Sequence, residues 1–407
     1  MNDKSEKTLA NDGTSSKGVT AETFDELLPF IKLCKAGHLD EVQSWINAGK
    51  PINPPPPIKG RRRKGPLHKA IDAGFYSIIE VLLKAGTVMA DSRPFALERA
   101  LANRRLDIVK LLIQYGANIK AVEMDLVFET WQPEIIDYFF EHGADVETGN
   151  PLAAALCERI KTALGAFKRH KDRFPQLQSQ IDIALRFHCR EGDKKWAGLM
   201  LWAGANPYSK GPDSPYESPD PDGDISALEY AAIWNRPEIF ELKQIKITPD
   251  IPVADELFEA VCRSENADLL LKMLDSGFDP TKRSDQGSGL INACFSGMDW
   301  PDWHNWFDRD RKIDLDTDHS REKIKMIYAL AKHGAKWIPT DNWEINDIRR
   351  TLLKMKDDYT VEFIWIMSKF KSCKRDNAVQ LLRTPAIQKL VSAHKTRMEE
   401  IINDFPE

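Results

Sequence analysis

The stretch GPLHKAIDAGFYSIIEVLLKAGT (65–87) holds a short segment with small residues, a second segment rich in apolar residues, and a glycine directly after it. The same ending, an apolar segment followed by glycine, recurs along the chain. The recurring glycines are Gly49, Gly86, Gly116, Gly143, Gly204, Gly277 and Gly334. Gly86 and Gly116 are 30 residues apart, and Gly116 and Gly143 are 27 apart. A period of this length is typical of a repeat protein.

Each period predicts a pair of short helices. In residues 106–113 apolar residues recur with the spacing of an α-helix, which predicts a second helix with a wide buried face. The preceding segment ALERALANRR (96–105) predicts a first helix with small residues. The glycine after each second helix suits the left-handed conformation that leads into a loop. Two short helices cannot bury their faces alone, so the units must stack on one another.

The stretch 65–87 resembles the ankyrin-repeat family, whose pattern runs roughly T-P-L-H-x-A-A-x-x-G-H-x-E-I-V-x-L-L-L-x-x-G-A. The residues in register are Pro66, Leu67, His68, Ala70, Gly74, Ile79, Leu82, Leu83 and Gly86. Further copies are found at 31–49 and 93–118, and weaker ones at 226–242 and 257–277. The resemblance is clear in residues 24–150 and degenerate to about 340. It implies an all-α solenoid of stacked helix-turn-helix units with loop insertions, and a chain that binds other macromolecules.

Three regions are expected along the chain. Residues 1–22 are polar, lack the apolar core of a signal peptide, and are expected to form a disordered tail. Residues 23–340 are expected to form an array of about nine or ten units. Residues 341–407 keep the character of helix pairs without the glycine. They are expected to be a C-terminal cap or degenerate repeats, with a separate small helical domain as the alternative.

Composition limits the possible functions. The 407 residues carry a formal net charge of −5, so the protein as a whole is not a polycation that seeks nucleic acid. We find no apolar run of the roughly 18 residues that a membrane span requires, and expect no membrane association. A reducing, cytoplasmic location is the expectation. The motifs of nucleotide-binding loops, zinc proteases and serine hydrolases are absent from the sequence, and we expect neither an enzyme nor a cofactor.

The six cysteines and two of the histidines fit structural roles. The sequence contains no C-x-x-C, and Cys34, Cys189, Cys262 and Cys294 each lie three residues before a turn between helices. We interpret this position as small and buried, and estimate that equivalent positions in stacked units lie about 10 Å apart, too far for a disulfide. His142 and His333 precede the glycine at the end of a second helix, where a histidine suits the helix dipole. We therefore expect no metal site.

Function is expected where the repeat is interrupted, since binding residues concentrate on loops. In PINPPPPIKGRRRKGP (51–66), a proline-rich segment leads to a basic finger formed by Arg61, Arg62, Arg63 and Lys64, which Arg104 and Arg105 could extend. In the insertion 296–322, Trp300, Trp303 and Trp306 form either a packed plug or an anchor for a partner. Residues 157–176 form a basic helix, and 208–226 are expected to be a long mobile loop.

These features favour a module that binds a protein partner through its concave face and inserted loops. The alternative is a nucleic-acid-associated binder that uses the basic finger against phosphate. A remote alternative is an enzyme in the irregular C-terminal half. The sequence does not specify the partner or the oligomeric state.

Overall fold

The computed structural model describes residues 18–56, 64–89, 95–220, 223–282, 289–296, 318–339, 342–354 and 357–382. These residues form two compact units, one within residues 1–180 and one within residues 181–407. Both are built from helices. The strands β1 (Lys210–Gly211) and β2 (Ile225–Ser226) are two residues each and pair antiparallel.

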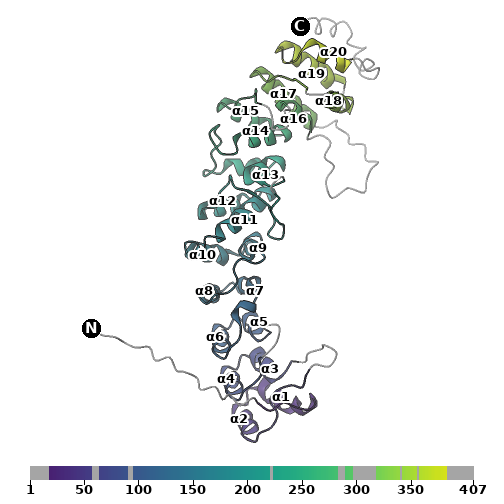
Figure 1. Ribbon diagram of the computed structural model, residues 1–407. Coiled ribbons are helices and arrows are strands. Elements are labelled where there is room, and N and C mark those ends of the chain that lie inside the picture. Colours follow the sequence, from purple (N-terminus) through teal and green to yellow (C-terminus); the bar gives the residue numbers. More distant parts are fainter. Residues whose placement is uncertain are drawn as a thin grey trace, which may run out of the picture. The chain divides into compact units, whose positions relative to one another are not determined.

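The first unit is a row of five helix pairs among its described residues (Figure 1). The first helices of the pairs are α1 (Leu28–Ala36), α3 (Pro66–Ala73), α5 (Phe95–Ala102), α7 (Met124–Phe128) and α9 (Pro151–Cys157). The second helices are α2 (Leu39–Asn47), α4 (Tyr76–Lys84), α6 (Leu106–Gln114), α8 (Pro133–Glu141) and α10 (Lys161–His170). Two 3-10 turns, η1 (Asp25–Leu27) and η2 (Ile119–Ala121), precede α1 and α7. Successive first helices pack against one another, and most successive second helices do so as well.

The second unit repeats this arrangement with longer and less regular elements. Its first helices are α11 (Leu177–Glu191, which begins in the first unit), α13 (Ala227–Ile233), α14 (Ala254–Arg263), α16 (Leu290–Ser296), α18 (Asn342–Lys354) and α20 (Arg375–Leu382). Its second helices are α12 (Lys194–Ala203), η3 (Pro237–Glu241), α15 (Ala267–Asp275), α17 (Asp318–Lys332) and α19 (Asp357–Lys369). The all-α architecture of stacked helix-turn-helix units predicted from the sequence is confirmed.

The apolar spacing of the second helices produces the core. In α6, Ile108, Val109, Leu111 and Leu112 are at most 3% exposed, as the helical period predicted. Burial of one such side chain stabilises the fold by roughly 1.5–3 kcal/mol relative to its exposure. Several helices begin at proline, among them α3, α8 and α9. Proline suits the first position of a helix because the amide hydrogen that it lacks has no partner there.

The seven recurring glycines all adopt the left-handed conformation that the sequence predicted. Their φ angles range from 65° at Gly49 to 110° at Gly204. Each follows the end of a second helix, where the chain turns into the loop that leads to the next pair. Residues with a Cβ rarely adopt this conformation, which accounts for glycine at these seven positions.

Residues 18–21, which the sequence placed in the tail, belong to the folded part. Thr20 forms a parallel bridge with Asn53, and the amide of Gly18 donates to the carbonyl oxygen of Gly86 over 3.0 Å. The Asn53 side chain is 2% exposed and donates to the carbonyl oxygen of Gly18, while its oxygen accepts from the amide of Val88. The segment thus joins the loops of the first two helix pairs. Residues 1–17 lie outside the described residues.

Helices α18, α19 and α20 stack on the preceding pairs in the same two rows. The amide of Trp337, which is 1% exposed, donates to the carbonyl oxygen of Ser372, and the Trp337 and Phe363 rings meet edge to face. Within the described ranges no helix is both long and apolar enough to cross a membrane. Residues 383–407 lie outside these ranges.

Candidate interaction surface

The structure describes only part of the residues that the sequence proposed for binding. Lys64 is exposed directly before α3. Arg61, Arg62 and Arg63 of the basic finger lie outside the described residues. Trp300, Trp303 and Trp306 of the inserted segment also lie outside them.

Arg105 is engaged within the fold. Its guanidinium group donates from Nε and Nη2 to the carboxylate of Asp107, and from Nη1 to the carbonyl oxygen of Gly74 in the preceding turn. The hydrogen bond with Asp107 raises the pKa of Arg105, and it lowers the pKa of Asp107. Arg105 therefore links two successive turns, and its extension of the basic finger stays a prediction because Arg61, Arg62 and Arg63 lie outside the described residues. Arg104 next to it is exposed.

The turn between the two helices of a pair contains one residue with positive φ in most pairs. In three pairs this residue is a glycine, namely Gly37, Gly74 or Gly192. In four others it carries a side chain. These four residues are Arg104, Trp131, Arg159 and Asn235, with φ angles of 53°, 58°, 65° and 50°. The left-handed conformation costs an L-residue with a Cβ roughly 1–2 kcal/mol.

Three of these residues follow one another in the first unit. Arg104, Trp131 and Arg159 stand at the ends of α5, α7 and α9, which pack side by side, and we call these three residues the turn row. Packed helices lie about 8–10 Å apart, which sets the spacing along the row. All three are exposed, and Trp131 keeps 48% of its surface accessible.

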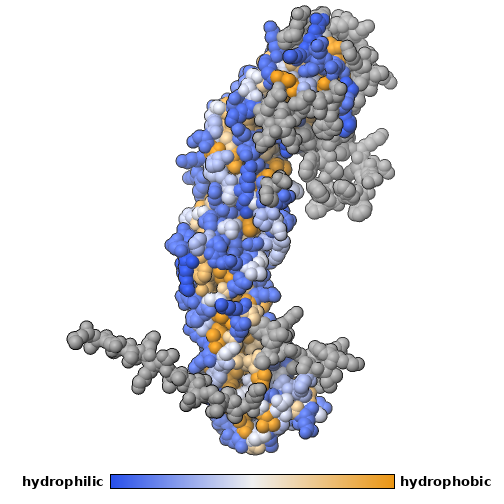
Figure 2. Space-filling model, viewed as in Figure 1, coloured by the Kyte–Doolittle hydropathy of each residue, from blue (hydrophilic) through white to orange (hydrophobic). Residues whose placement is uncertain are grey.

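Arg104 was named from the sequence as a binding candidate and Arg159 lies within the predicted basic helix at 157–176, whereas Trp131 and the alignment of the three turns were missed. The signal that could have found the turn row is alignment of the turns, because each residue occupies the position at which Gly37 and Gly74 stand. The accessible face shown in Figure 2 is mostly hydrophilic, with small hydrophobic patches between the charged residues.

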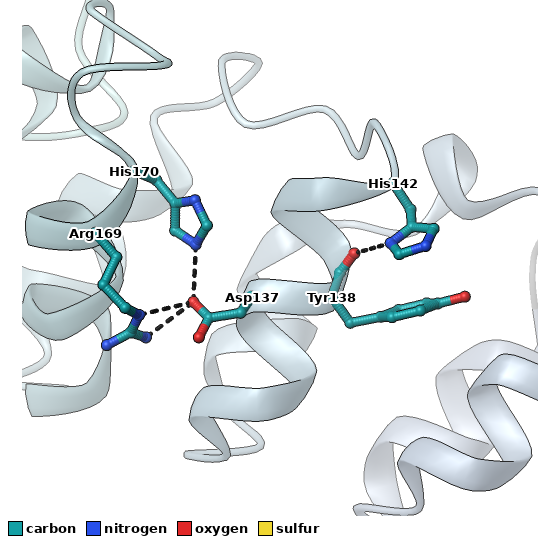
Figure 3. A network of polar contacts seen from close by, with 5 residues as sticks. All are labelled: Asp137, Tyr138, His142, Arg169 and His170. Carbon is teal, nitrogen blue, oxygen red and sulfur yellow. Dashed lines mark hydrogen bonds and ion pairs between the residues drawn. The ribbon is translucent and has the colours of Figure 1, made fainter. Parts of the chain in front are cut away.

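The single basic helix expected at 157–176 is interrupted, because Cys157 ends α9, Arg159 lies in a left-handed turn, and α10 spans only Lys161–His170. Its arginine Arg169 donates from Nε and Nη2 to one carboxylate oxygen of Asp137 in α8, and His170 Nε2 lies 2.8 Å from the same oxygen (Figure 3). The His170 ring also stacks on Phe140 of α8. Arg169 and His170 therefore join two second helices to each other, which accounts for part of the positive charge that the sequence left unexplained.

The segment 204–226 is held in place by a buried arginine. Arg186 of α11 is 3% exposed and donates to the carbonyl oxygens of Pro212 over 2.7 Å and of Ser209 over 3.1 Å. Asp182, one turn earlier, accepts from the amide of Asn206 and from the hydroxyl of Ser209. Residues 206–213 are therefore anchored by α11, in contrast to the mobile loop that the sequence predicted, whereas residues 216–220 are exposed.

A second arginine of α11 extends this anchor. Arg190 Nη1 lies 2.6 Å from an oxygen of Asp213, which is 4% exposed. Burial raises the pKa of Asp213, and the Arg190 charge opposes this rise. Burial also raises the pKa of Tyr230 to about 12. The cluster combines two guanidinium groups with buried partners, which is typical of a structural anchor.

The histidines at the ends of second helices cap them as predicted. His142 Nδ1 lies 2.7 Å from the carbonyl oxygen of Tyr138 (Figure 3), and His333 Nδ1 lies 2.8 Å from that of Ala329. The six cysteines are free thiols, and all but the half-buried Cys157 are buried. Within the described ranges the structure holds no group of three or more His, Cys, Asp or Glu side chains placed to bind a metal ion.

Comparison with known proteins supports the resemblance seen in the sequence. Residues 20–123, which include the first three helix pairs, match the family model of ankyrin repeats in three copies. No curated protein matches the chain. A similar solved structure is the ankyrin repeat domain of human ASB11, which is 14% identical. The match covers 67% of this chain and 99% of that one, with a TM-score of 0.29.

Proposed function

We propose that this chain, which carries ankyrin repeats at residues 20–123, binds a protein partner and that the turn row forms part of the binding surface. Ankyrin repeats are generally protein–protein interaction modules, and the family is typically non-enzymatic. We further propose that the concave face and the inserted loops contact the partner, and that the protein is cytoplasmic.

The observation that carries the proposal is Trp131. This residue adopts a left-handed conformation at φ 58° and exposes 48% of its surface. Strained backbone and a large exposed aromatic ring both oppose the stability and solubility of an isolated chain. Tryptophan and arginine are also the residues most enriched among those that dominate binding energy at protein interfaces. A role in binding explains why Arg, Trp and Arg occupy three successive turns at the position where other turns have glycine.

The test compares Trp131→Gly with wild type in affinity capture from the native cell, followed by a measured dissociation constant for the protein recovered. Glycine relieves the left-handed turn, so the variant is expected to fold while losing binding by at least tenfold, as for a central interface residue. Arg104→Gly and Arg159→Gly are expected to weaken binding less.

A matched control is Trp202→Ala in α12, since Trp202 is the more exposed tryptophan at 60%. The proposal is supported if Trp202→Ala still binds the partner and Trp131→Gly does not. Equal affinity of wild type and Trp131→Gly overturns the turn row as the surface. Deletion of residues 57–63 and of 297–317, each in turn, assigns the contribution of the basic finger and of the tryptophan insertion.

Nucleic-acid binding is the competing outcome. A contact through the basic finger predicts an affinity for duplex DNA that falls with salt, with a slope of about −0.9 in log units per phosphate contacted. Binding of this kind that disappears when Arg61, Arg62 and Arg63 are replaced by alanine would favour this alternative over a protein partner.

A further inference from the structure

Two neighbouring first helices in the second unit place cysteines at the same position. Three residues before the turn, the first helices carry Cys34, Ile71, Leu101, Phe128 and Leu156 in the first unit, and Cys189, Ala232, Cys262 and Cys294 in the second. All are at most 2% exposed. The position is therefore buried throughout but not uniformly small, which corrects the sequence interpretation. Among these residues, only Cys262 and Cys294 are cysteines in successive helices.

The two thiols are in contact. Cys262 of α14 and Cys294 of α16 are both 0% exposed, their helices pack side by side, and their thiols hydrogen bond to each other. With α-carbon atoms about 10 Å apart, as estimated for stacked units, a disulfide between these thiols would require the two helices to move closer together.

A buried cation lies beside the pair. Lys323 of α17 is 1% exposed, and its ammonium group donates to the carbonyl oxygens of Arg263 over 2.7 Å and of Cys262 over 3.4 Å. It thereby caps the carboxyl end of α14, where a positive charge is favourable. The hydrogen bond from Cys262 lowers the pKa of Cys294, burial opposes this shift, and the Lys323 charge adds a smaller lowering. Burial raises the pKa of Cys262 and lowers the pKa of Lys323.

The other buried thiols lack this environment. Cys34 of α1 lies next to α3, whose equivalent residue is Ile71, and burial raises the pKa of Cys34 to about 12. Burial raises the pKa of Cys373 to about 12 as well, and it raises that of Cys189. A buried thiol in apolar surroundings is inert, whereas a neighbouring lysine favours the reactive thiolate.

We infer that Cys262 and Cys294 form a redox-sensitive pair that a hydroperoxide converts to a disulfide between neighbouring repeats. The Cys294 sulfur attacks the terminal oxygen of the hydroperoxide, the O–O bond breaks, and a sulfenic acid and one molecule of water or alcohol result. The Cys262 sulfur then attacks the Cys294 sulfur, the S–O bond breaks, and water leaves. Two thiols lose two protons and two electrons, and hydrogen peroxide is reduced to two molecules of water.

The bond would tie α14 to α16 covalently. Because neither sulfur is exposed, the oxidant reaches the pair when the two helices separate locally, and oxidation then prevents a wider separation. This inference is independent of the proposed binding surface, which lies in the first unit.

The test treats the reduced, full-length protein with hydrogen peroxide, blocks remaining thiols by alkylation, and measures the intact mass and the peptide map. We expect a loss of two hydrogen masses and a linked pair of peptides that contain Cys262 and Cys294. Cys262→Ala and Cys294→Ala should each abolish this loss. Alanine is already present at the equivalent position as Ala232, so both variants are expected to fold.

Cys189→Ala is the matched control, since it removes a buried thiol from the same position of another helix and should leave the linkage intact. The inference is overturned if Cys262 and Cys294 are alkylated separately after peroxide treatment, or if the loss of mass persists in Cys262→Ala. A linkage between either cysteine and Lys323 would overturn it as well.

Discussion

The guanidinium group of Arg186 donates from Nε to the carbonyl oxygen of Pro212 over 2.7 Å, and only 3% of the Arg186 surface is exposed. This contact holds an irregular segment of the second unit against α11. Replacement by lysine keeps the charge but loses the planar set of donors, so that Pro212 and Ser209 lose acceptor partners.

We expect Arg186→Lys to lower the free energy of unfolding by roughly 2–4 kcal/mol and to expose residues 204–226 to proteolysis. Urea denaturation and limited proteolysis measure the two effects. Lys210→Ala removes an exposed ion pair with Glu256 and serves as control, with an expected loss below about 1 kcal/mol. An unchanged rate of cleavage in Arg186→Lys would show that the anchor does not hold the segment.

The turn at Trp131 allows strain to be separated from side-chain chemistry. Because Trp131 has φ 58°, Trp131→Gly is expected to be more stable than Trp131→Ala by about 1 kcal/mol. Thermal denaturation of the two variants measures the difference. The reverse exchange, Gly74→Ala, should destabilise the fold, since φ is 75° and the added Cβ would lie 2.9 Å from Arg105 Nη1. Equal stability of the two Trp131 variants would contradict the strain assigned to this turn.

Asn53 links the N-terminal segment to the second loop. Asn53→Leu removes the hydrogen bonds to Gly18 and Val88, and we expect a loss of roughly 1–3 kcal/mol, because two part-buried backbone groups lose a partner. Hydrogen exchange should accelerate at Gly18, Ala21 and Val88. Protection of α15, in the other unit, should stay unchanged and serves as the internal control. Slow exchange at Val88 in the variant would refute this role.

Stability is expected to fall in alkaline solution. Burial raises the pKa of Cys34 and of Cys373 to about 12, and that of Tyr230 to about 12. A raised pKa in the folded state contributes stability that is complete below the pKa of the unfolded chain and is lost as the pH rises toward the folded value. The free energy of unfolding at about pH 11 should therefore lie below that at about pH 8. The difference should shrink in Cys34→Ala, and an undiminished difference would remove Cys34 from the explanation.

Much of the fold could be predicted from the sequence, because its signals are local. The glycines after the second helices and the apolar period of 106–113 each report on a neighbouring backbone conformation. The anchor at Arg186 has no such signal, since its partners are carbonyl oxygens of distant residues, which any sequence would supply. Trp131 was missed because a left-handed tryptophan follows no propensity rule, so that only an alignment of the turns reveals its position. Contact between Cys262 and Cys294 depends on side-chain direction in two neighbouring helix pairs, which the spacing of the repeat does not give.

The N-terminal segment has a consequence for the order of folding during synthesis. Residues 18–21 leave the ribosome before their partner Gly86, and Asn53 is held by the amide of Val88, which also emerges later. The segment must therefore wait until the second helix pair has emerged, since chains fold as their parts become available. A nascent chain that ends before residue 86 exposes the edge that this segment later covers. The first repeat is complete only after the second has been made.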